Sequence, residues 1–593
     1  MVRASDFLLL SSIPALIAIH AVVSPYTKVE ESFHIQAVHD IETYGIPFEN
    51  IPDTFRAQYD HFSFPGAVPR TFIGALILSG ISRPFLWLNG ALNRQLLARL
   101  ILGLFNAYAL LSYAAGIRRA FGRTTSTWFL LFLASQFHVI YYASRTLSNM
   151  FVFGITTLAL RCLLPESIDP ERYSKRCRLS LYLMTIAGII FRSEIALLLA
   201  AHTIFLFIVR RISIRRVIIP AGVSGLLVGL TLTVTVDSFF WQQFPLWPEL
   251  AAFKFNVISG NAAAWGTHPW HFYFLNAIPR LLLNPLTYLV GVPSSLLHIS
   301  TRRSALHILI PTLAYVAIYS FQPHKEWRFI IYTVPPLTAV SALGTAYIWT
   351  HRMKSILHCL LSLIFILSTL LSFLLSTFVL LPISAANYPG AHALNALHAY
   401  ANNNDPKPTI FVHLGNLACQ TGVTRFLQLP PPEKPLVYLP GSPDGSVPAL
   451  RSGSPLWRYD KTENETLKAT PAFWAQFDYV LAEPGEETDR IRSVVQPEDS
   501  DSDAHDRWEV VDVVEGFAGI RVLRPQEEGE KEPGPTGGAG GGKFEEELVG
   551  KVLGSKGVEL WRLGVAMLRR YVTRGWWAEV RMEPKIQILK HVR

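Results

Sequence analysis

The chain has little charge and little cysteine for its length. Charged residues make up 16% of its 593 residues, against about 25% in soluble globular domains, whereas 50% are hydrophobic and 12% aromatic. The four cysteines, Cys162, Cys177, Cys359 and Cys419, fall in different regions without metal-ligand spacing, which disfavours both a disulfide framework and a cysteine metal site. The composition excludes an ordinary soluble domain and indicates a protein that crosses a membrane several times.

Concentrated positive charge is also lacking. The net charge of +9 is spread over many short loops, so we expect no nucleic-acid partner. The first apolar run, Phe7–Val23, has one flanking base, Arg3, and no clear small-residue cleavage site. We therefore expect it to be retained as a membrane span rather than removed as a signal peptide.

Apolar runs follow one another as far as residue 382, and about twelve of them are span candidates. They are Phe7–Val23, Thr71–Gly90, Leu96–Gly116, Trp128–Tyr142, Met150–Leu164, Leu179–Ile190, Ile195–Val209, Val217–Val236, Ile278–Val292, Ala305–Phe321, Ile330–Trp349 and Leu357–Leu381. Several are short or interrupted by proline, so a few are expected to be re-entrant or interfacial.

Basic clusters predict which ends of these runs face the cytosol. They lie near residues 118, 172, 210, 302 and 352, and an even number of runs separates each from the next, so all five fit the cytosolic face. Three runs precede the first cluster, where a cytosolic N-terminus needs an even number. Either one run does not span fully or a short loop breaks the rule. Pro84 and the Ser79-Gly80 pair favour Thr71–Gly90 as a run that does not span fully.

Beyond residue 383 the composition becomes that of a soluble domain. Short strands are predicted over Thr409–Leu414, Phe477–Ala482, Trp508–Val514 and Gly519–Leu523. We therefore expect a multi-span helical domain over 1–383 and a small α/β domain over 384–525 on the non-cytosolic face. A flexible linker over 526–543 and a C-terminal tail over 544–593 follow, the tail with an interfacial helix near Leu560–Trp577.

Two adjacent carboxylates, Glu30 and Glu31, stand out in the polar and aromatic loop 24–70, which lies between two apolar runs. Carboxylates this close to a bilayer are costly unless they are solvated or used. One interpretation is a solvated helix start in which Thr27 caps the helix and Glu30 follows three residues later. The other is that the pair is catalytic.

Three further groups on the same face combine aromatic rings with acids, amides and cations. They are Tyr59, Asp60 and His61 with Arg70; Asp237 with Trp265 and Trp270; and His324, Lys325 and Arg328 within His324–Phe329. Rings stack on the C–H faces of sugars, and carboxylates bind sugar hydroxyls. Each group alone is also typical of an aromatic belt or a snorkelling basic cluster, but their collection on one face favours a sugar site.

The segment HKEWRFIIY, His324–Tyr332, resembles the His-Lys-Glu-x-Arg-Phe signature of the dolichyl-phosphate-mannose-dependent mannosyltransferases of glycosyltransferase family 22. Other segments resemble the branch of this family that elongates a heptamannosyl oligosaccharide. They are Pro25–Asp40, Tyr59–Phe72, Val236–Trp241, Trp265–Arg280, Asn387–Gly390, Gln420–Leu427 and Trp457–Glu463. The resemblance runs from about Pro25 to about Ala482.

The resemblance implies a mostly α fold, a polytopic membrane helical bundle of GT-C type with a small C-terminal lumenal α/β domain, in the endoplasmic reticulum membrane. It implies dolichyl-phosphate-mannose as donor and a dolichyl-diphosphate-linked oligosaccharide as acceptor, joined through an α-1,6 bond with inversion at the donor carbon. It implies a lumenal active site and no cofactor, since members of the family are metal-independent.

It also implies roles for the residues already singled out. One of Glu30 and Glu31 is the catalytic base, and comparison with sister enzymes, which carry His-Pro-Asp-Glu here, favours Glu30. The donor phosphate is expected to contact His324, Lys325, Arg328 and Arg70. Sugar contacts are expected from the remaining candidates, Tyr59, Asp60, His61, Asp237, Trp265 and Trp270.

Three alternatives remain open from the sequence. A sister enzyme that forms an α-1,2 bond, in oligosaccharide or glycolipid-anchor assembly, would share most of these features. A multispanning lipid transporter would explain the spans but not the acids and aromatics gathered on one face, and no pair of similar halves supports it. A scaffold subunit would not need the intact acid pair and basic motif.

Overall fold

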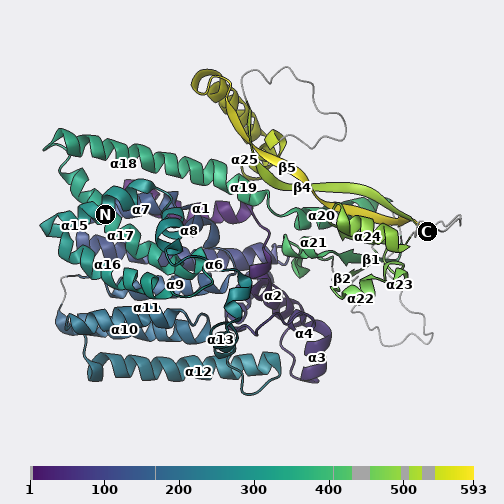
Figure 1. Cartoon of the computed structure of the whole chain (residues 1–593), viewed down its shortest axis with the longest axis horizontal. Coiled ribbons are helices and arrows are strands. Elements are labelled where there is room, and N and C mark those ends of the chain that lie inside the picture. The colour runs from purple at the N-terminus through teal and green to yellow at the C-terminus, as the bar shows by residue number, and fades with distance from the viewer. Residues whose placement is uncertain are drawn as a thin grey trace. The chain divides into compact units, whose positions relative to one another are not determined.

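The computed structural model describes residues 4–166, 169–404, 407–429, 455–495, 507–523 and 541–592. The chain forms two compact units (Figure 1). Unit 1 comprises Met1–Val22 and Phe33–Leu381, and unit 2 comprises Val23–Ser32 and Pro382–Arg593. The acidic segment before Phe33 therefore belongs with the C-terminal half of the chain, although its neighbours in sequence on both sides belong to unit 1.

Unit 1 is helical throughout its described part. Its α-helices are α1 (Ala4–Val23), α2 (Ser32–Tyr44), α3 (Ile51–Gln58), α4 (Asp60–Ser63), α5 (Ile73–Leu88), α6 (Arg94–Phe121), α7 (Arg123–Ser135), α8 (Phe137–Tyr142), α9 (Ser148–Cys162), α10 (Pro170–Ile190), α11 (Ile195–Ile208), α12 (Ile219–Trp241), α13 (Pro248–Phe253), α14 (Ile278–Leu282), α15 (Val292–Leu297), α16 (Ile299–Tyr319), α17 (Val334–Thr350) and α18 (Ile356–Leu375). Side chains that accept backbone N–H groups begin several of them, as Asn93 does for α6 and Asp169 for α10.

Five helical segments of the described chain are long and apolar enough to cross a membrane. They are Asp6–Val23, Arg94–Phe121, Ile214–Trp241, Trp327–Thr350 and Ile356–Ala385, with Ile73–Leu88, Ile195–Ile208 and Thr287–Leu297 as shorter apolar helices. This is fewer than the twelve runs counted in the sequence. The run around Pro84 is one of the short ones, as a proline inside a 16-residue helix would suggest.

The five spans differ in what they face. Of the apolar 18-residue stretch in each segment, 94% is buried in the segment ending in α17, whereas only 22% is buried in the segment beginning with α18, which presents leucines outward. Small residues allow α17 to pack closely, because a Cβ added to Gly344 would meet the carbonyl oxygen of Gly291 at 2.0 Å. α17 is thus the centre of the bundle, and α18 presents an apolar surface suited to lipid.

Unit 2 is an α/β domain built on one five-stranded sheet. Its strands are β1 (Thr409–Leu414), β2 (Leu456–Asp460), β3 (Tyr479–Ala482), β4 (Arg507–Leu523) and β5 (Trp577–Val592), and its helices are α19 (Leu381–Ala385), α20 (Pro389–Asn404), α21 (Asn416–Gln420), α22 (Glu465–Lys468), α23 (Pro471–Trp474), α24 (Glu486–Val495) and α25 (Gly541–Met567). The strand order is β2-β1-β3-β5-β4, with β1 parallel to β2 and β3, and β5 antiparallel to β3 and β4.

Alternating side chains divide this sheet into two packed faces. Leu481 and Ile588 join Leu394 and Leu397 of α20 in one cluster, while Leu589 joins Phe473 and the other aromatics around α23 in a second. The strands predicted over 409–414, 477–482 and 508–523 are found close to those bounds, the last two segments as one strand with register shifts, one of them next to Gly519.

The C-terminal segment differs from the prediction of a tail. α25 covers the predicted interfacial helix only as far as Met567, and Leu560, Leu563 and Met567 are exposed along it. The chain then returns as β5, which begins at Trp577 and pairs with both β3 and β4. Pro584 inside the run argued against a strand, and the alternation that buries Ile586 and Ile588 is short. The linker predicted over 526–543 lies outside the described residues up to 540.

Candidate active site

The basic motif of unit 1 is organised around Glu326, which precedes the turn η7 (Trp327–Thr333) leading into α17. The Arg328 guanidinium donates to both oxygens of Glu326, from Nε at 2.5 Å and Nη2 at 2.7 Å. His324 lies with Nε2 3.0 Å from Glu326 and Nδ1 3.0 Å from the carbonyl oxygen of Gly266. Since both partners are acceptors, both bonds form together only when the imidazole carries two protons.

Lys325 is placed differently from its neighbours. Its side chain is buried, and Nζ donates to the carbonyl oxygens of Gln322 at 2.6 Å and His268 at 2.8 Å. Burial lowers the pKa of this ammonium group. Three rotatable donors suit such a carbonyl cage, so Lys325 joins two loops of unit 1, and its hydrogen-bonding capacity is largely taken up within the protein.

Behind the motif lies a buried polar network that sequence reasoning missed. Glu194 Oε1 accepts from Arg192 Nε at 2.8 Å, from Asn149 Nδ2 at 3.1 Å and from the Tyr332 hydroxyl at 3.2 Å. Asn149 also donates to the carbonyl oxygen of Arg328 at 3.2 Å. The network therefore ties the loop between α10 and α11 to the backbone of the basic motif.

Arg192 is the cation of this network. Burial alone would lower its pKa, but the carboxylates of Glu194 and Glu249 hold the pKa above its ordinary value. Its Cζ lies 5.3 Å from the centre of the Phe329 ring, and Cζ of Arg328 lies 5.9 Å from the same centre. The sequence offered one indication, the Arg192-Ser193-Glu194 triplet with two charged residues between two apolar runs.

Glu249 lies on the other side of the same loop. Its carboxylate accepts the backbone N–H of Ser193 at 2.7 Å. Desolvation raises the pKa of Glu249 to about 7, and Glu194 adds to this, while Arg192 opposes it. Arg192 therefore lies near two acids, Glu194 of the same loop and Glu249 of α13, whose pKa lies in the neutral range.

Asp237, expected to bind sugar, is placed as a structural anchor at the end of α12. Its carboxylate is fully buried and accepts the backbone N–H of Phe72 at 2.7 Å, the Thr71 hydroxyl at 3.2 Å and the Thr233 hydroxyl at 2.6 Å. It satisfies the orphan N–H at the start of α5. The sequence could not distinguish this use of a carboxylate from a sugar contact.

The Tyr59, Asp60 and His61 group lies inside unit 1 rather than on its surface. All three side chains are buried, the Tyr59 hydroxyl donates to the carbonyl oxygen of Gly45 at 2.5 Å, and His61 Nε2 donates to that of Phe240 at 2.9 Å. Burial lowers the pKa of His61, which favours the neutral ring. These contacts assign the group to the support of the loop.

The remaining predicted contacts are exposed side chains. Trp265 is 61% and Trp270 68% exposed, and Arg70 is also exposed. The Arg70 carbonyl oxygen accepts the indole N–H of Trp241 at 2.9 Å. Exposed indole rings are available to stack on a sugar.

The acid pair lies in unit 2, in the single turn η1 (Val29–Glu31). Glu30 is exposed and forms no hydrogen bond or ion pair with any described residue. Glu31 is buried, and its carboxylate accepts the backbone N–H of Lys28 at 3.2 Å. Successive residues of a 3₁₀ turn point about 120° apart, so the turn separates the two acids, and Glu31 rather than Glu30 closes the cap.

The acid pair is anchored to α20 through Tyr26. Its hydroxyl accepts from Asn395 Nδ2 at 3.0 Å, and its ring meets the edge of His392 with centres 5.1 Å apart. Nζ of Lys28 lies 5.2 Å from the centre of the Tyr388 ring. Segments far apart in the chain therefore fix the acidic turn within one unit.

Two of the segments that carried the family resemblance meet at this anchor. Gly390, in Asn387–Gly390, donates its N–H to the Thr421 hydroxyl at 3.0 Å. Gly422 follows at φ +114°, where a Cβ would come within 3.2 Å of Tyr26 Cβ and 2.8 Å of Ala391 Cβ. Glycine is required here both by the backbone angle and by the close approach.

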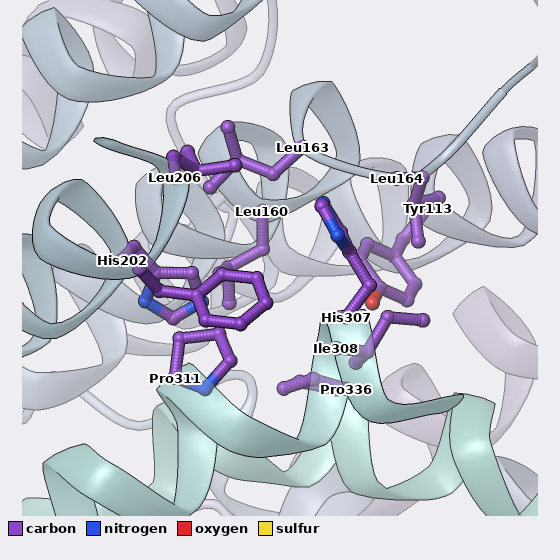
Figure 2. A pocket seen from close by; sticks show the side chains of 11 residues that line it. Tyr113, Leu160, Leu163, Leu164, His202, Leu206, His307, Ile308, Pro311 and Pro336 are labelled. Atoms are coloured by element: carbon purple, nitrogen blue, oxygen red, sulfur yellow. The ribbon is translucent and has the colours of Figure 1, made fainter. Parts of the chain in front are cut away.

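Two other features of the molecule do not form a site. A cavity of about 20 Å³ in unit 1 is lined by Tyr113, His202, His307 and apolar side chains (Figure 2). It has room for about one water molecule, and neither a carboxylate nor an arginine or lysine lines it. Within the described ranges, no group of three or more His, Cys, Asp or Glu residues is arranged to hold a metal ion.

The architecture is that of a known membrane class. The crystal structure of ArnT from Cupriavidus metallidurans bound to undecaprenyl phosphate matches 72% of this chain and 85% of its own, with a TM-score of 0.50 and 14% identity. That likeness concerns the fold alone, which is of the GT-C type.

The sequence comparisons define the family. The profile of the Alg9-like mannosyltransferase family matches residues 11–428, and the chain belongs to this family. The Saccharomyces cerevisiae Dol-P-Man:Man(7)GlcNAc(2)-PP-Dol alpha-1,6-mannosyltransferase is 33% identical over 540 residues, 85% of this chain and 87% of its own. The Schizosaccharomyces pombe protein described as the probable enzyme of the same activity is 35% identical over 480 residues, 81% of this chain and 78% of its own.

Proposed function

We propose that this chain is a dolichyl-phosphate-mannose-dependent α-1,6-mannosyltransferase that extends a lipid-linked heptamannosyl oligosaccharide. One observation carries the proposal: the curated relatives with this activity in their names match most of the chain, at 33 to 36% identity. The proposal includes a location in the endoplasmic reticulum membrane with a lumenal active site, which the family resemblance supports.

The reaction is a single displacement with inversion. The 6-hydroxyl oxygen of an acceptor mannose forms a bond to C1 of the donor mannose while the C1–oxygen bond to dolichyl phosphate breaks. The bonding pair leaves with the phosphate, and the hydroxyl proton passes to a carboxylate base. A β-linked donor thereby becomes an α-linked product, with dolichyl phosphate as the second product.

Glu30 is the base in this proposal. It is exposed and has no competing partner among the described residues, whereas the Glu31 carboxylate is bonded to the Lys28 N–H. Glu31 supports the turn that presents Glu30. A single base suffices because the leaving phosphate departs as an anion and needs no proton.

The departing phosphate requires positive charge. Arg328 supplies it as a planar fork that Glu326 holds in place on one edge, and His324 adds a second cation when doubly protonated. With these groups the mechanism needs no metal ion. Trp265 and Trp270, both exposed, are the candidates for stacking on acceptor sugars.

An in vitro transfer assay tests the function. The full chain in lipid nanodiscs receives synthetic dolichyl-phosphate-mannose and a panel of lipid-linked glycans, in excess EDTA, and the product is digested with linkage-specific mannosidases. We expect one α-1,6-linked mannose on the heptamannosyl acceptor. An α-1,2-linked product, or transfer to a glycolipid-anchor intermediate, would replace the proposal by the sister activity, and activity restored only by Mg²⁺ or Mn²⁺ would overturn the metal-free mechanism.

A further inference from the structure

Most of the positive charge in the basic motif is already engaged within the protein. Nζ of Lys325 donates to the carbonyl oxygens of Gln322 and His268 at 2.6 and 2.8 Å. Glu326 accepts from Arg328 through two nitrogens and lies 3.0 Å from His324. A departing phosphate carries at least one full negative charge, so a site with one partly occupied arginine is short of donors.

Arg192 has the donors that the motif lacks. Its Nε is bonded to Glu194, which fixes the plane of the guanidinium group. Neither of its terminal nitrogens has a hydrogen-bond partner in the described part of the chain. The side chain is 25% exposed, so these two nitrogens are not sealed in the core.

The surroundings hold this fork beside the motif. Cζ of Arg192 and Cζ of Arg328 lie 5.3 and 5.9 Å from the centre of the same ring, Phe329. Tyr332, which donates to Glu194, follows Phe329 by three residues in the same helical turn. Glu194, whose Oε1 takes three donors, keeps the arginine in one orientation before any ligand arrives, which lowers the entropic cost of binding.

We propose that Arg192 binds the phosphate of the donor lipid through its two terminal nitrogens, as the second arginine of the site that contains Arg328. The assignment rests on the proposed function. An arginine suits it better than a lysine, because its planar fork can bond Glu194 on one edge and two phosphate oxygens on another. The same chemistry would fit the diphosphate of the acceptor lipid, so the experiment separates the two sources.

The test compares Arg192→Gln with wild-type protein in nanodiscs. Binding is measured for dolichyl phosphate and for dolichol, which has the same chain without the phosphate. We expect the Kd of dolichyl phosphate to rise about tenfold or more, the effect of losing a charge-assisted contact, and the Kd of dolichol to stay unchanged. In transfer assays the KM of the donor should rise, and the KM of the diphosphate-linked acceptor should not.

Arg176→Gln is the matched control. Arg176 donates to Glu166 at 2.9 Å, so it is another arginine paired with a glutamate in unit 1, and its removal should leave both Kd values as in the wild type. Arg192→Lys keeps the charge but not the fork. It should still raise the Kd of dolichyl phosphate severalfold, which provides a second measurement if Arg192→Gln does not fold.

The possible results separate the assignment from the proposed function. If Arg192→Gln and Arg192→Lys bind dolichyl phosphate as tightly as wild type, the assignment is overturned. It is also overturned if both variants lose as much affinity for dolichol as for dolichyl phosphate, because Arg192 then only supports the loop. A rise confined to the acceptor KM would assign Arg192 to the acceptor diphosphate and also overturn it. If wild-type protein shows Arg192-dependent binding of dolichyl phosphate but transfers no mannose, the assignment stands and the proposed function fails.

Discussion

The acidic turn of unit 2 and the basic motif of unit 1, each taken within its own unit, use their charges in opposite ways. In the acidic turn, Glu30 has no partner among the described residues, while Glu31 is bonded to the turn. In the basic motif, His324, Lys325 and Arg328 are all bonded within the protein. A charged residue in a motif is therefore not by itself available to bind substrate or to transfer a proton, because its partners within the protein can already occupy its hydrogen-bonding groups.

The largest effect should come from the acid without a partner. Glu30→Gln keeps the shape of the side chain and removes its ability to accept a proton, so we expect kcat to fall about 10²- to 10⁴-fold with the acceptor KM little changed. Glu49→Gln, another acid of loop 24–70, is the control. Retention of wild-type kcat in Glu30→Gln would place the base elsewhere, with Glu31 the next acid to test and Asp60 after it.

Arg328→Ala should have the next largest effect. It removes a phosphate donor and also leaves the Glu326 carboxylate without its closest cation, so kcat/KM should fall at least tenfold. Transfer assays on Arg328→Ala and Arg176→Ala give the comparison. If both retain wild-type kcat/KM, the basic motif is an interfacial anchor and not a phosphate site.

Tyr26→Phe examines whether the anchor matters to the acidic turn. The change removes the hydroxyl that accepts from Asn395, a hydrogen bond worth about 0.5–1.5 kcal/mol, so kcat should fall roughly two- to tenfold. Asn395→Ala should do the same, and the double variant should be no worse than either single one. Additive losses would show that the two residues act independently of each other.

Lys325→Met should have the smallest effect on the reaction. It removes the donor that the half-buried Gln322 and the exposed His268 carbonyl oxygens share, a loss of about 0.5–1.5 kcal/mol per hydrogen bond in the free energy of unfolding, so Tm should fall while the donor KM stays near wild type. A rise in donor KM comparable to that of Arg328→Ala, with Tm unchanged, would return Lys325 to the phosphate site.

Much of the fold followed from local patterns. Apolar runs predicted a membrane bundle, and the strands near 409–414, 477–482 and 508–523 appeared as alternating or buried segments. β5 did not, because Pro584 interrupts it and because the partners that make it a strand, β3 and β4, come from other parts of the chain. Pairing between distant segments leaves little trace in a single stretch of sequence.

The candidate site was less predictable than the fold, because the role of a charged side chain depends on the residues that contact it in the folded chain. The Asp237 carboxylate accepts a backbone N–H at the start of α5, and the Lys325 ammonium group donates to two carbonyl oxygens. Arg192 was not predicted as a site residue, because two charged residues between apolar runs are typical of any short loop. Only the bonds to Glu194, together with the Phe329 ring, relate it to the basic motif.

The most direct test of the contrast between available and engaged charges is a side-by-side measurement of kcat for Glu30→Gln and Glu31→Gln at saturating donor and acceptor. Glutamine at position 31 can still accept the Lys28 N–H through its carbonyl oxygen, so Glu31→Gln should keep the turn and turn over at least tenfold faster than Glu30→Gln. An inactive Glu31→Gln variant together with an active Glu30→Gln variant would contradict the account and make the buried acid, Glu31, the base.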